Sequence, residues 1–84
     1  MYRVSLLRAA ERDLNHLSAK LFNRIIAAIQ ALAKAPRPPG SRKLAGSEND
    51  WRIRVGDYRI IYEIDDASGE VRINRVRHRR EVYR

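Results

Sequence analysis

The chain has 84 residues, no cysteine and a formal net charge of +8 at neutral pH. This length provides for one hydrophobic core, so we expect a single domain over residues 1–84. The lack of cysteine excludes disulfides and thiolate metal sites, and the charge predicts a polyanionic partner, either nucleic acid or an acidic protein.

The N-terminal half predicts one strand followed by two helices. Residues 2–7 alternate between apolar and polar side chains, as a strand does. From Arg8 onward the apolar residues recur at helical spacing, and Ser18 is a suitable N-cap for a second helix over residues 20–34. Prolines from Pro36 onward end that helix, and the short break between the two helices predicts an antiparallel helical hairpin.

The C-terminal half predicts a loop over residues 36–50 and then three strands, over residues 51–55, 58–65 and 71–79. A turn of uncertain type is expected at Gly56–Asp57. The apolar pattern of the last strand changes parity between Ile73 and Val76, which indicates a β-bulge. The order β-α-α-β-β-β predicts a two-layer α+β fold in which the helical hairpin packs on an antiparallel sheet.

Basic residues alternate with the apolar residues of two neighbouring strands. If the apolar residues face the helices, then Arg52, Arg54 and Arg59 face away from them. Like charges on adjacent strands destabilise a sheet, and such a cluster is most useful when an anion spans it. A solvated basic surface without a ligand is the alternative that the charge pattern leaves open.

The C-terminal segment adds two groups that can transfer protons. His78 can do so near neutral pH, and the arginines beside Tyr83 favour its phenolate form. The alternatives are a surface histidine and a tyrosine that only packs. With two histidines and no cysteine we expect no metal and no cofactor, and the short apolar runs and unremarkable N-terminus predict a cytoplasmic protein without a membrane partner.

Four segments, taken in order, resemble the RelE/ParE toxin superfamily. They are Lys43-Leu44-Ala45-Gly46, the run from Trp51 to Ile64, the run from Val76 to Arg79, and Val82-Tyr83. The resemblance covers essentially the whole chain and agrees with the β-α-α-β-β-β order. It implies a toxin of a type II toxin–antitoxin module, and for the RelE-like branch a metal-independent endoribonuclease that cleaves mRNA in the ribosomal A site and so inhibits translation.

The resemblance also implies catalytic roles. Arg59 matches the family's phosphate-binding arginine, Arg79 its last-strand arginine, and Tyr83 the C-terminal tyrosine that stacks on the substrate or helps to activate it. The implied reaction is attack of a ribose 2′-oxygen on the adjacent phosphate. We hypothesise that His78, beside Arg79, carries the proton in this reaction.

The remaining basic positions are assigned to RNA and phosphate binding. Arg52 and Arg54 match positions at which RelE enzymes commonly have lysine, and because arginine stays protonated above about pH 12 we assign them electrostatic support. Lys43 and Arg77 are expected to add phosphate contacts.

The resemblance implies a neutralising partner as well. We expect a cognate acidic antitoxin that folds onto the basic face and forms a hetero-oligomer with the toxin. Arg79, Tyr83 and the basic pair on the second strand favour the RelE-like branch. A ParE-like inhibitor of DNA gyrase and a catalytically inactive binding protein with the same fold are the alternatives.

Overall fold

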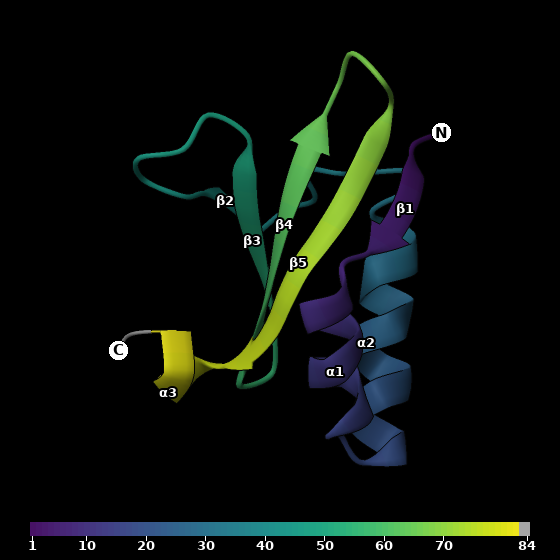
Figure 1. Cartoon of the computed structure of the whole chain (residues 1–84), viewed down its shortest axis with the longest axis vertical. Coiled ribbons are helices and arrows are strands. Elements are labelled where there is room, and N and C mark those ends of the chain that lie inside the picture. The colour runs from purple at the N-terminus through teal and green to yellow at the C-terminus, as the bar shows by residue number, and fades with distance from the viewer. Residues whose placement is uncertain (83–84) are drawn as a thin grey trace.

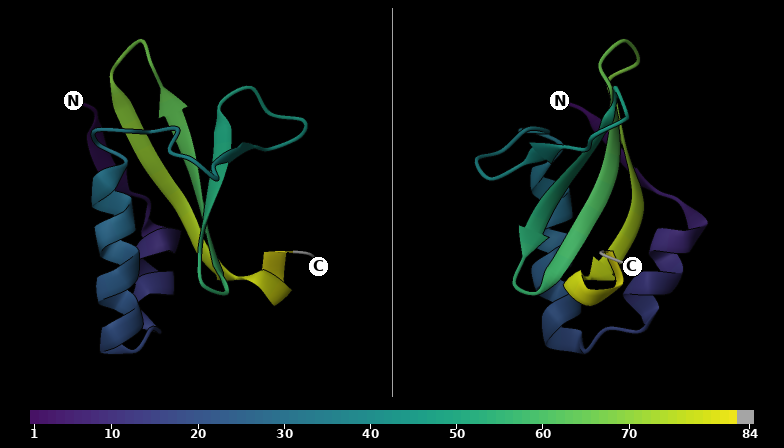
Figure 2. Two further views of the ribbon diagram at one scale, coloured as in Figure 1. Left: turned by 180° about the vertical axis from the view of Figure 1, so that it is seen from behind. Right: turned by 90° about the vertical axis from the view of Figure 1, so that its left-hand side faces the viewer.

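The computed structural model describes the backbone of residues 1–82 and the side chains of residues 1–80. Its elements are β1 (Arg3–Leu6), α1 (Arg8–Asn15), α2 (Ala19–Ala31), β2 (Arg42–Lys43), β3 (Asp50–Val55), β4 (Tyr58–Asp65), β5 (Glu70–His78) and α3 (Arg79–Val82). Helices α1 and α2 cover one face of the sheet, and α3 lies on the opposite side (Figures 1 and 2). The predicted two-layer α+β fold is confirmed.

The sheet has five strands in the order β1-β5-β4-β3-β2. The antiparallel pairing predicted for the late strands is confirmed, but β1 runs parallel to β5, so the sheet is mixed. Strand β2 falls in the segment that the sequence predicted to be a loop, and it pairs with β3. Side-chain alternation identifies the faces of a strand but not its neighbour, which explains both differences.

The core lies between the sheet and the two helices. Its buried apolar residues are Ala10, Leu14, Ile25, Ile29, Leu32, Ile53, Ile60, Tyr62, Ile64, Val71, Ile73 and Val76. Phe22 of α2 lies outside the core and is 37% exposed. Trp51 packs against the edge of the core, and its outer side is covered by the Arg37 guanidinium 5.1 Å from the ring centre.

The predicted β-bulge is present in β5. Ile61 of β4 stands opposite Arg75, whereas the next residue, Tyr62, stands opposite Ile73, so Asn74 is the extra residue. The insertion reverses which alternate residues of β5 face the helices. Ile73 before the bulge and Val76 after it are therefore both buried in the core.

Beyond the end of β1, helix α1 provides the hydrogen-bond acceptor for the edge of β5. Strand β1 pairs with β5 only as far as Ile73. Beyond that point the Asp13 carboxylate of α1 accepts hydrogen bonds from the Val76 amide at 2.8 Å and from the Arg75 guanidinium at 2.8 and 3.1 Å. The β3–β4 turn is formed by Gly56 with a φ of +58° and by a residue without a positive φ, the combination of a type II′ turn.

The segment between α2 and β2 is fastened to the far end of the sheet. Arg37 forms an ion pair with Asp66 at 2.9 Å, and Asp66 also accepts a hydrogen bond from the Tyr2 hydroxyl at 2.6 Å. The Tyr62 hydroxyl donates to the Pro36 carbonyl at 2.7 Å. We call this group, Tyr2, Pro36, Arg37, Tyr62 and Asp66, the loop clasp, because it holds the loop that leads into β2.

Candidate functional site: a basic sheet face

The strand register assembles arginines on the face of the sheet that α1 and α2 leave open. Arg59 on β4 stands opposite Arg54 on β3 and opposite Arg77 on β5. Residues opposite each other in an antiparallel pair project to the same face, and the neighbouring Ile60 is buried against the helices. Three guanidiniums from three strands therefore share the open face, as the sequence predicted for Arg54 and Arg59.

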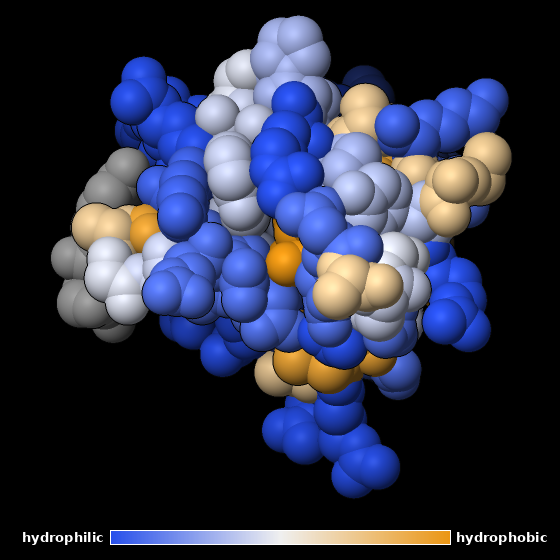
Figure 3. Space-filling model, turned by 90° about the horizontal axis from the view of Figure 1, so that it is seen from above, coloured by the Kyte–Doolittle hydropathy of each residue, from blue (hydrophilic) through white to orange (hydrophobic). Residues whose placement is uncertain are grey.

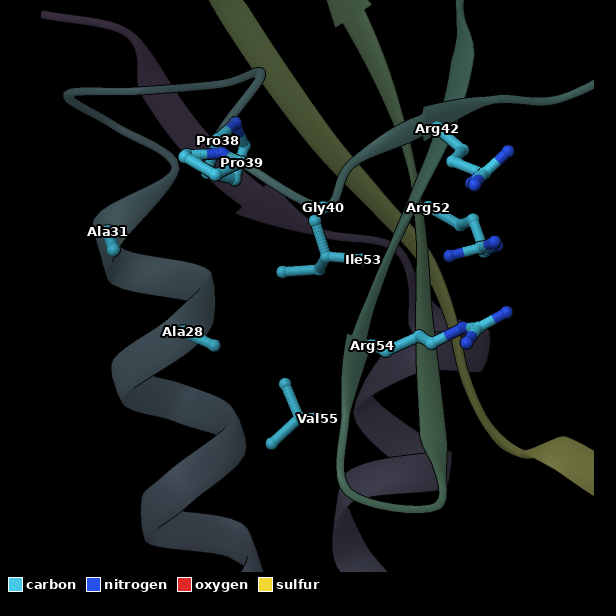
Figure 4. Close-up of a pocket in the computed structure, with 10 residues that line it drawn as sticks. All are labelled: Ala28, Ala31, Pro38, Pro39, Gly40, Arg42, Arg52, Ile53, Arg54 and Val55. Atoms are coloured by element: carbon cyan, nitrogen blue, oxygen red, sulfur yellow. The ribbon is translucent and has the colours of Figure 1, made fainter.

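A second pair of arginines extends this cluster toward the edge of the sheet. Arg52 lies two residues before Arg54 on β3, and Arg42 on β2 stands opposite Arg52. Figure 4 shows Arg42, Arg52 and Arg54 pointing to the same side, whereas Ile53 and Val55 point the other way, toward α2. We call the five residues Arg42, Arg52, Arg54, Arg59 and Arg77 the arginine track.

Lys43 does not join the track by register. Its partner on β3 is Trp51, which packs on the helical side of the sheet, so Arg42, and not Lys43, shares the open face with Arg52. Sequence reasoning missed Arg42 because a strand of two residues inside a loop has no periodicity to detect.

Arg59 differs from the other members of the track in its burial. Its side chain is only 6% exposed, whereas Arg54 is exposed. Helix α3 contacts β4 and β5, the strands that carry Arg59 and Arg77. A guanidinium held in a site with little water attracts an anion more strongly than one in bulk solvent.

The candidate residues near the C-terminus occupy elements that differ from those predicted. Strand β5 ends at His78, one residue earlier than predicted, so Arg79 begins α3 instead of ending the strand. The last-strand arginine in register with Arg59 is Arg77. Tyr83 lies outside the described residues.

His78 faces the opposite side of the sheet from Arg59. Its strand partner is Tyr58, which packs against the core, and the two rings meet edge to face with their centres 5.4 Å apart. His78 Nδ1 accepts a hydrogen bond from the Arg80 amide at 3.3 Å, as an N-capping side chain of α3 does. The structure therefore does not bring the imidazole to the face on which the arginine track lies.

Acidic residues border the arginine track on the side toward the β4–β5 turn. Asp50 on β3 and Glu63 on β4 are register partners, and Glu63 in turn stands opposite Arg72 on β5. Arg72 donates hydrogen bonds to Glu63 at 2.7 Å and to Glu70 at 3.3 Å. The open face is therefore divided into a basic half and an acidic half.

A groove of about 450 Å³ lies between α2 and the edge of the sheet. It is lined by Ala28, Ala31, Pro38, Pro39, Gly40, Arg42, Arg52, Ile53, Arg54 and Val55 (Figure 4). Strand β2 pairs only with Trp51 and Arg52, so the C-terminal half of β3 borders this groove. By contrast, the end of the molecule seen in Figure 3 is mainly hydrophilic, with apolar residues in small separate areas.

Two properties of the described residues bear on the type of site. Among residues 1–82 no helix is long and apolar enough to cross a membrane. The same part of the chain contains no group of three or more histidine, aspartate or glutamate side chains placed to hold a metal ion.

Comparisons with known proteins show the family to which the chain belongs. Residues 4–83 match the family described as ParE toxin of the type II toxin–antitoxin system, parDE. The chain belongs to the RelE/ParE toxin superfamily. It is therefore a toxin of a type II toxin–antitoxin system, and the resemblance inferred from the sequence is confirmed.

Individual RelE/ParE relatives cover nearly the whole chain. Toxin RelG of Mycobacterium tuberculosis is 36% identical to this chain over an alignment of 87 positions. The alignment covers 99% of this chain and 97% of the relative. A chain of the RelBE2 toxin–antitoxin complex of M. tuberculosis superposes with a TM-score of 0.81 at 29% identity, covering 92% of this chain and 96% of that one. A chain of the archaeal RelE–RelB complex of Pyrococcus horikoshii gives 0.83 at 26% identity, covering 93% and 94%.

Proposed function

We propose that this toxin is an endoribonuclease that cleaves mRNA in the ribosomal A site without a metal ion and thereby inhibits translation. The observation that carries the proposal is the row of Arg54, Arg59 and Arg77 across three strands, with Arg59 buried. Guanidiniums fixed on rigid strands are suited to a phosphate whose charge grows during the reaction. A substrate on the ribosome places the protein in the cytoplasm.

The proposed reaction is attack of a ribose 2′-oxygen on the adjacent phosphate. The 2′-hydroxyl loses its proton as the new bond to phosphorus forms, the bond to the 5′-oxygen breaks, and that oxygen takes up a proton. The products are a 2′,3′-cyclic phosphate and a 5′-hydroxyl. In this scheme Arg59 and Arg77 bind the phosphate oxygens, and Arg54 supports the charge of the transition state.

Proton transfer needs a group other than these arginines, because arginine stays protonated at all physiological pH values. We assign this work to Tyr83, and we propose that Arg79, the first residue of α3, contributes its charge to substrate binding. The geometry of His78 favours a structural role in capping α3. Lys43, with its exposed side chain, remains a proposed contact to RNA or to the ribosome outside the arginine track.

The proposal is tested by mapping new 5′ ends on a defined mRNA in a translating extract. The wild-type toxin should produce ends within the A-site codon, and Arg59→Gln or Arg77→Gln should reduce cleavage roughly a hundredfold or more. Lys20→Gln, on the exposed side of α2, is the charge-matched control and should cleave as wild type does. Intact mRNA with the folded wild-type toxin would refute the proposal.

We further propose that a cognate acidic antitoxin binds this chain and forms a hetero-oligomer with it. Two solved relatives are toxin–antitoxin complexes, and the net charge of +8 favours an acidic partner. The groove beside β3 combines small apolar side chains with flanking arginines. Val55→Glu should weaken antitoxin binding at every salt concentration, whereas Arg54→Glu should mainly reduce its salt dependence, as titrations with purified antitoxin will measure.

A non-enzymatic function is the second candidate, and one observation favours it. The positions at which RelE enzymes commonly carry lysine are here Arg52 and Arg54, which supply charge but no proton. Such a toxin would act as a ParE-like gyrase inhibitor or as an inactive binding protein. Toxicity that survives the double substitution of Arg79 and Tyr83, together with loss of supercoiling in a gyrase assay, would identify the gyrase inhibitor.

A further inference from the structure

We infer that single-stranded RNA crosses this toxin along the arginine track, from Arg77 over Arg59 to the edge strands, with Arg42 binding a phosphate beyond the cleavage site. The inference rests on the proposed function, and it adds the direction of the RNA backbone and one binding residue. No sequence pattern pointed to Arg42, and its place comes from the pairing of β2 with β3.

The spacing of the track suits a chain of phosphates. Arg77, Arg59 and Arg54 lie on adjacent strands, which are about 4.8 Å apart. Arg52 follows at two residues along β3, a rise of roughly 7 Å, and Arg42 at one further strand. The guanidiniums thus form a continuous path across four strands, along which a polyanion meets a cation at each step.

The routes from Arg59 toward the β4–β5 turn lead to acidic groups. Movement along β3 or β4 toward the β4–β5 turn meets Asp50 and Glu63, which repel a phosphate backbone. On β5 the next arginine from Arg77 toward the bulge, Arg75, is bound to Asp13 of α1. Toward β2, by contrast, the path continues through the cationic side chains of Arg52 and Arg42, so the charge pattern favours this direction.

Two arginines of the track are available to an external anion. Both Arg42 and Arg54 are exposed, and within the described part of the chain neither forms an ion pair with a carboxylate. The backbone of Arg42 is held by its pairing with Arg52, and the loop clasp anchors the preceding segment through Arg37. Arg42 is therefore a pre-positioned phosphate ligand on a fixed backbone.

The test uses 2′-O-methyl RNA oligonucleotides of increasing length, which bind but offer no 2′-hydroxyl for cleavage. Affinity of the free toxin is measured by fluorescence anisotropy over a range of salt concentrations. Arg42→Ala should weaken binding of the longer oligonucleotides roughly two- to tenfold and lower the slope of log affinity against log salt by about 0.7. The shortest oligonucleotides, which do not reach β2, should bind the variant as they bind wild type.

Two further variants separate this inference from the proposed function. Lys34→Ala, beyond the end of α2, removes an exposed positive charge outside the track and should leave affinity unchanged. Arg59→Ala should weaken binding at every length. If Arg59→Ala weakens binding and Arg42→Ala does not, the path is wrong while the proposed nuclease site stands.

Two other outcomes are also decisive. If neither Arg59→Ala nor Arg42→Ala changes the affinity, RNA binding by this face is refuted, and the proposed function fails with it. If Asp50→Asn strengthens binding of long RNA while Arg42→Ala has no effect, the RNA runs over the acidic half of the face, which overturns the inferred direction.

Discussion

The carboxylate of Asp13 on α1 lies 2.8 Å from the guanidinium of Arg75 on β5 and also accepts the Val76 amide at 2.8 Å. Burial tends to raise the pKa of Asp13, but the hydrogen bonds from Arg75 and Val76 outweigh it and hold the pKa below its usual value of 3.8. One side chain thus closes the edge of the sheet and ties it to the helical layer.

We expect Asp13→Asn to lower the free energy of unfolding at pH 7 by about 1–2 kcal/mol, because a charged hydrogen-bond acceptor is lost from a mostly buried position. The folded-state pKa is lowered, so the stabilisation is present above pH 3.8 and is lost as the pH falls below it. Urea denaturation at pH 7 and in the acid range will measure both effects. Glu11→Gln, on the exposed side of α1, is the control and should change neither.

Tyr62 makes the stability of the fold depend on pH in the opposite sense, with a loss of stability at alkaline pH. Burial raises its pKa from 10.0 to about 12, so the folded protein keeps the phenol protonated after the unfolded chain has lost that proton. Stability is therefore fully present below pH 10 and falls as the pH rises through about 12. Tyr62→Phe should cost about 1 kcal/mol at pH 7, by loss of the bond to Pro36, and should flatten the alkaline decline in denaturation experiments. An alkaline decline as steep as that of wild type would contradict this account.

The Arg37–Asp66 pair should contribute little to global stability. Both side chains are more than 40% exposed, and solvent-exposed pairs contribute about 0.2–1 kcal/mol. In a double-mutant cycle with Arg37→Ala and Asp66→Ala we expect a coupling energy in that range. Amide hydrogen exchange at Gly40 and Ser41, which follow the prolines of this loop, should nevertheless increase in the Arg37→Ala variant, and unchanged exchange there would argue against the loop clasp.

His78 offers a test between a proton carrier and a helix cap. We expect His78→Asn to retain the wild-type cleavage rate, because asparagine is an effective N-cap and can accept the Arg80 amide. Loss of a general acid or base would instead reduce the rate roughly a hundredfold or more. The rate is measured by single-turnover cleavage on ribosomes, with His16→Asn, at the C-cap of α1, as the matched control.

The sequence alone was sufficient to predict the strands in which apolar and polar residues alternate. It was also sufficient to place Arg52, Arg54 and Arg59 on one face of the sheet. It also located the bulge in β5, because Ile73 and Val76 break the period of two. The sequence did not predict the position of residues that depend on pairing between strands distant in the chain. Arg42 acquires its place from a two-residue strand, and nothing local to residues 36–50 signals which strand it will meet.

The C-terminal assignments depended on the same kind of information. Whether Arg77 or His78 faces Arg59 is decided by the register after the bulge, and whether Arg79 belongs to a strand or a helix is decided by where β5 ends. A list of basic residues in sequence order contains neither fact. The burial of Arg59 was equally hidden, since α3 was not predicted.

The bulge at Asn74 shifts the alternation of β5, so different alternate residues face the core before and after it. Before it, β5 gives Val71 and Ile73 to the core, and after it the same strand gives Val76 to the core and Arg77 to the open face. If Asn74 were instead paired as a regular strand residue opposite Ile61, Val76 would stand opposite Arg59 and Arg77 would point into the apolar layer. The bulge therefore decides whether Arg59 has a cation or an apolar side chain beside it, without any change in the composition of the strand, so the spacing within β5 matters to this site as much as the identity of its arginines.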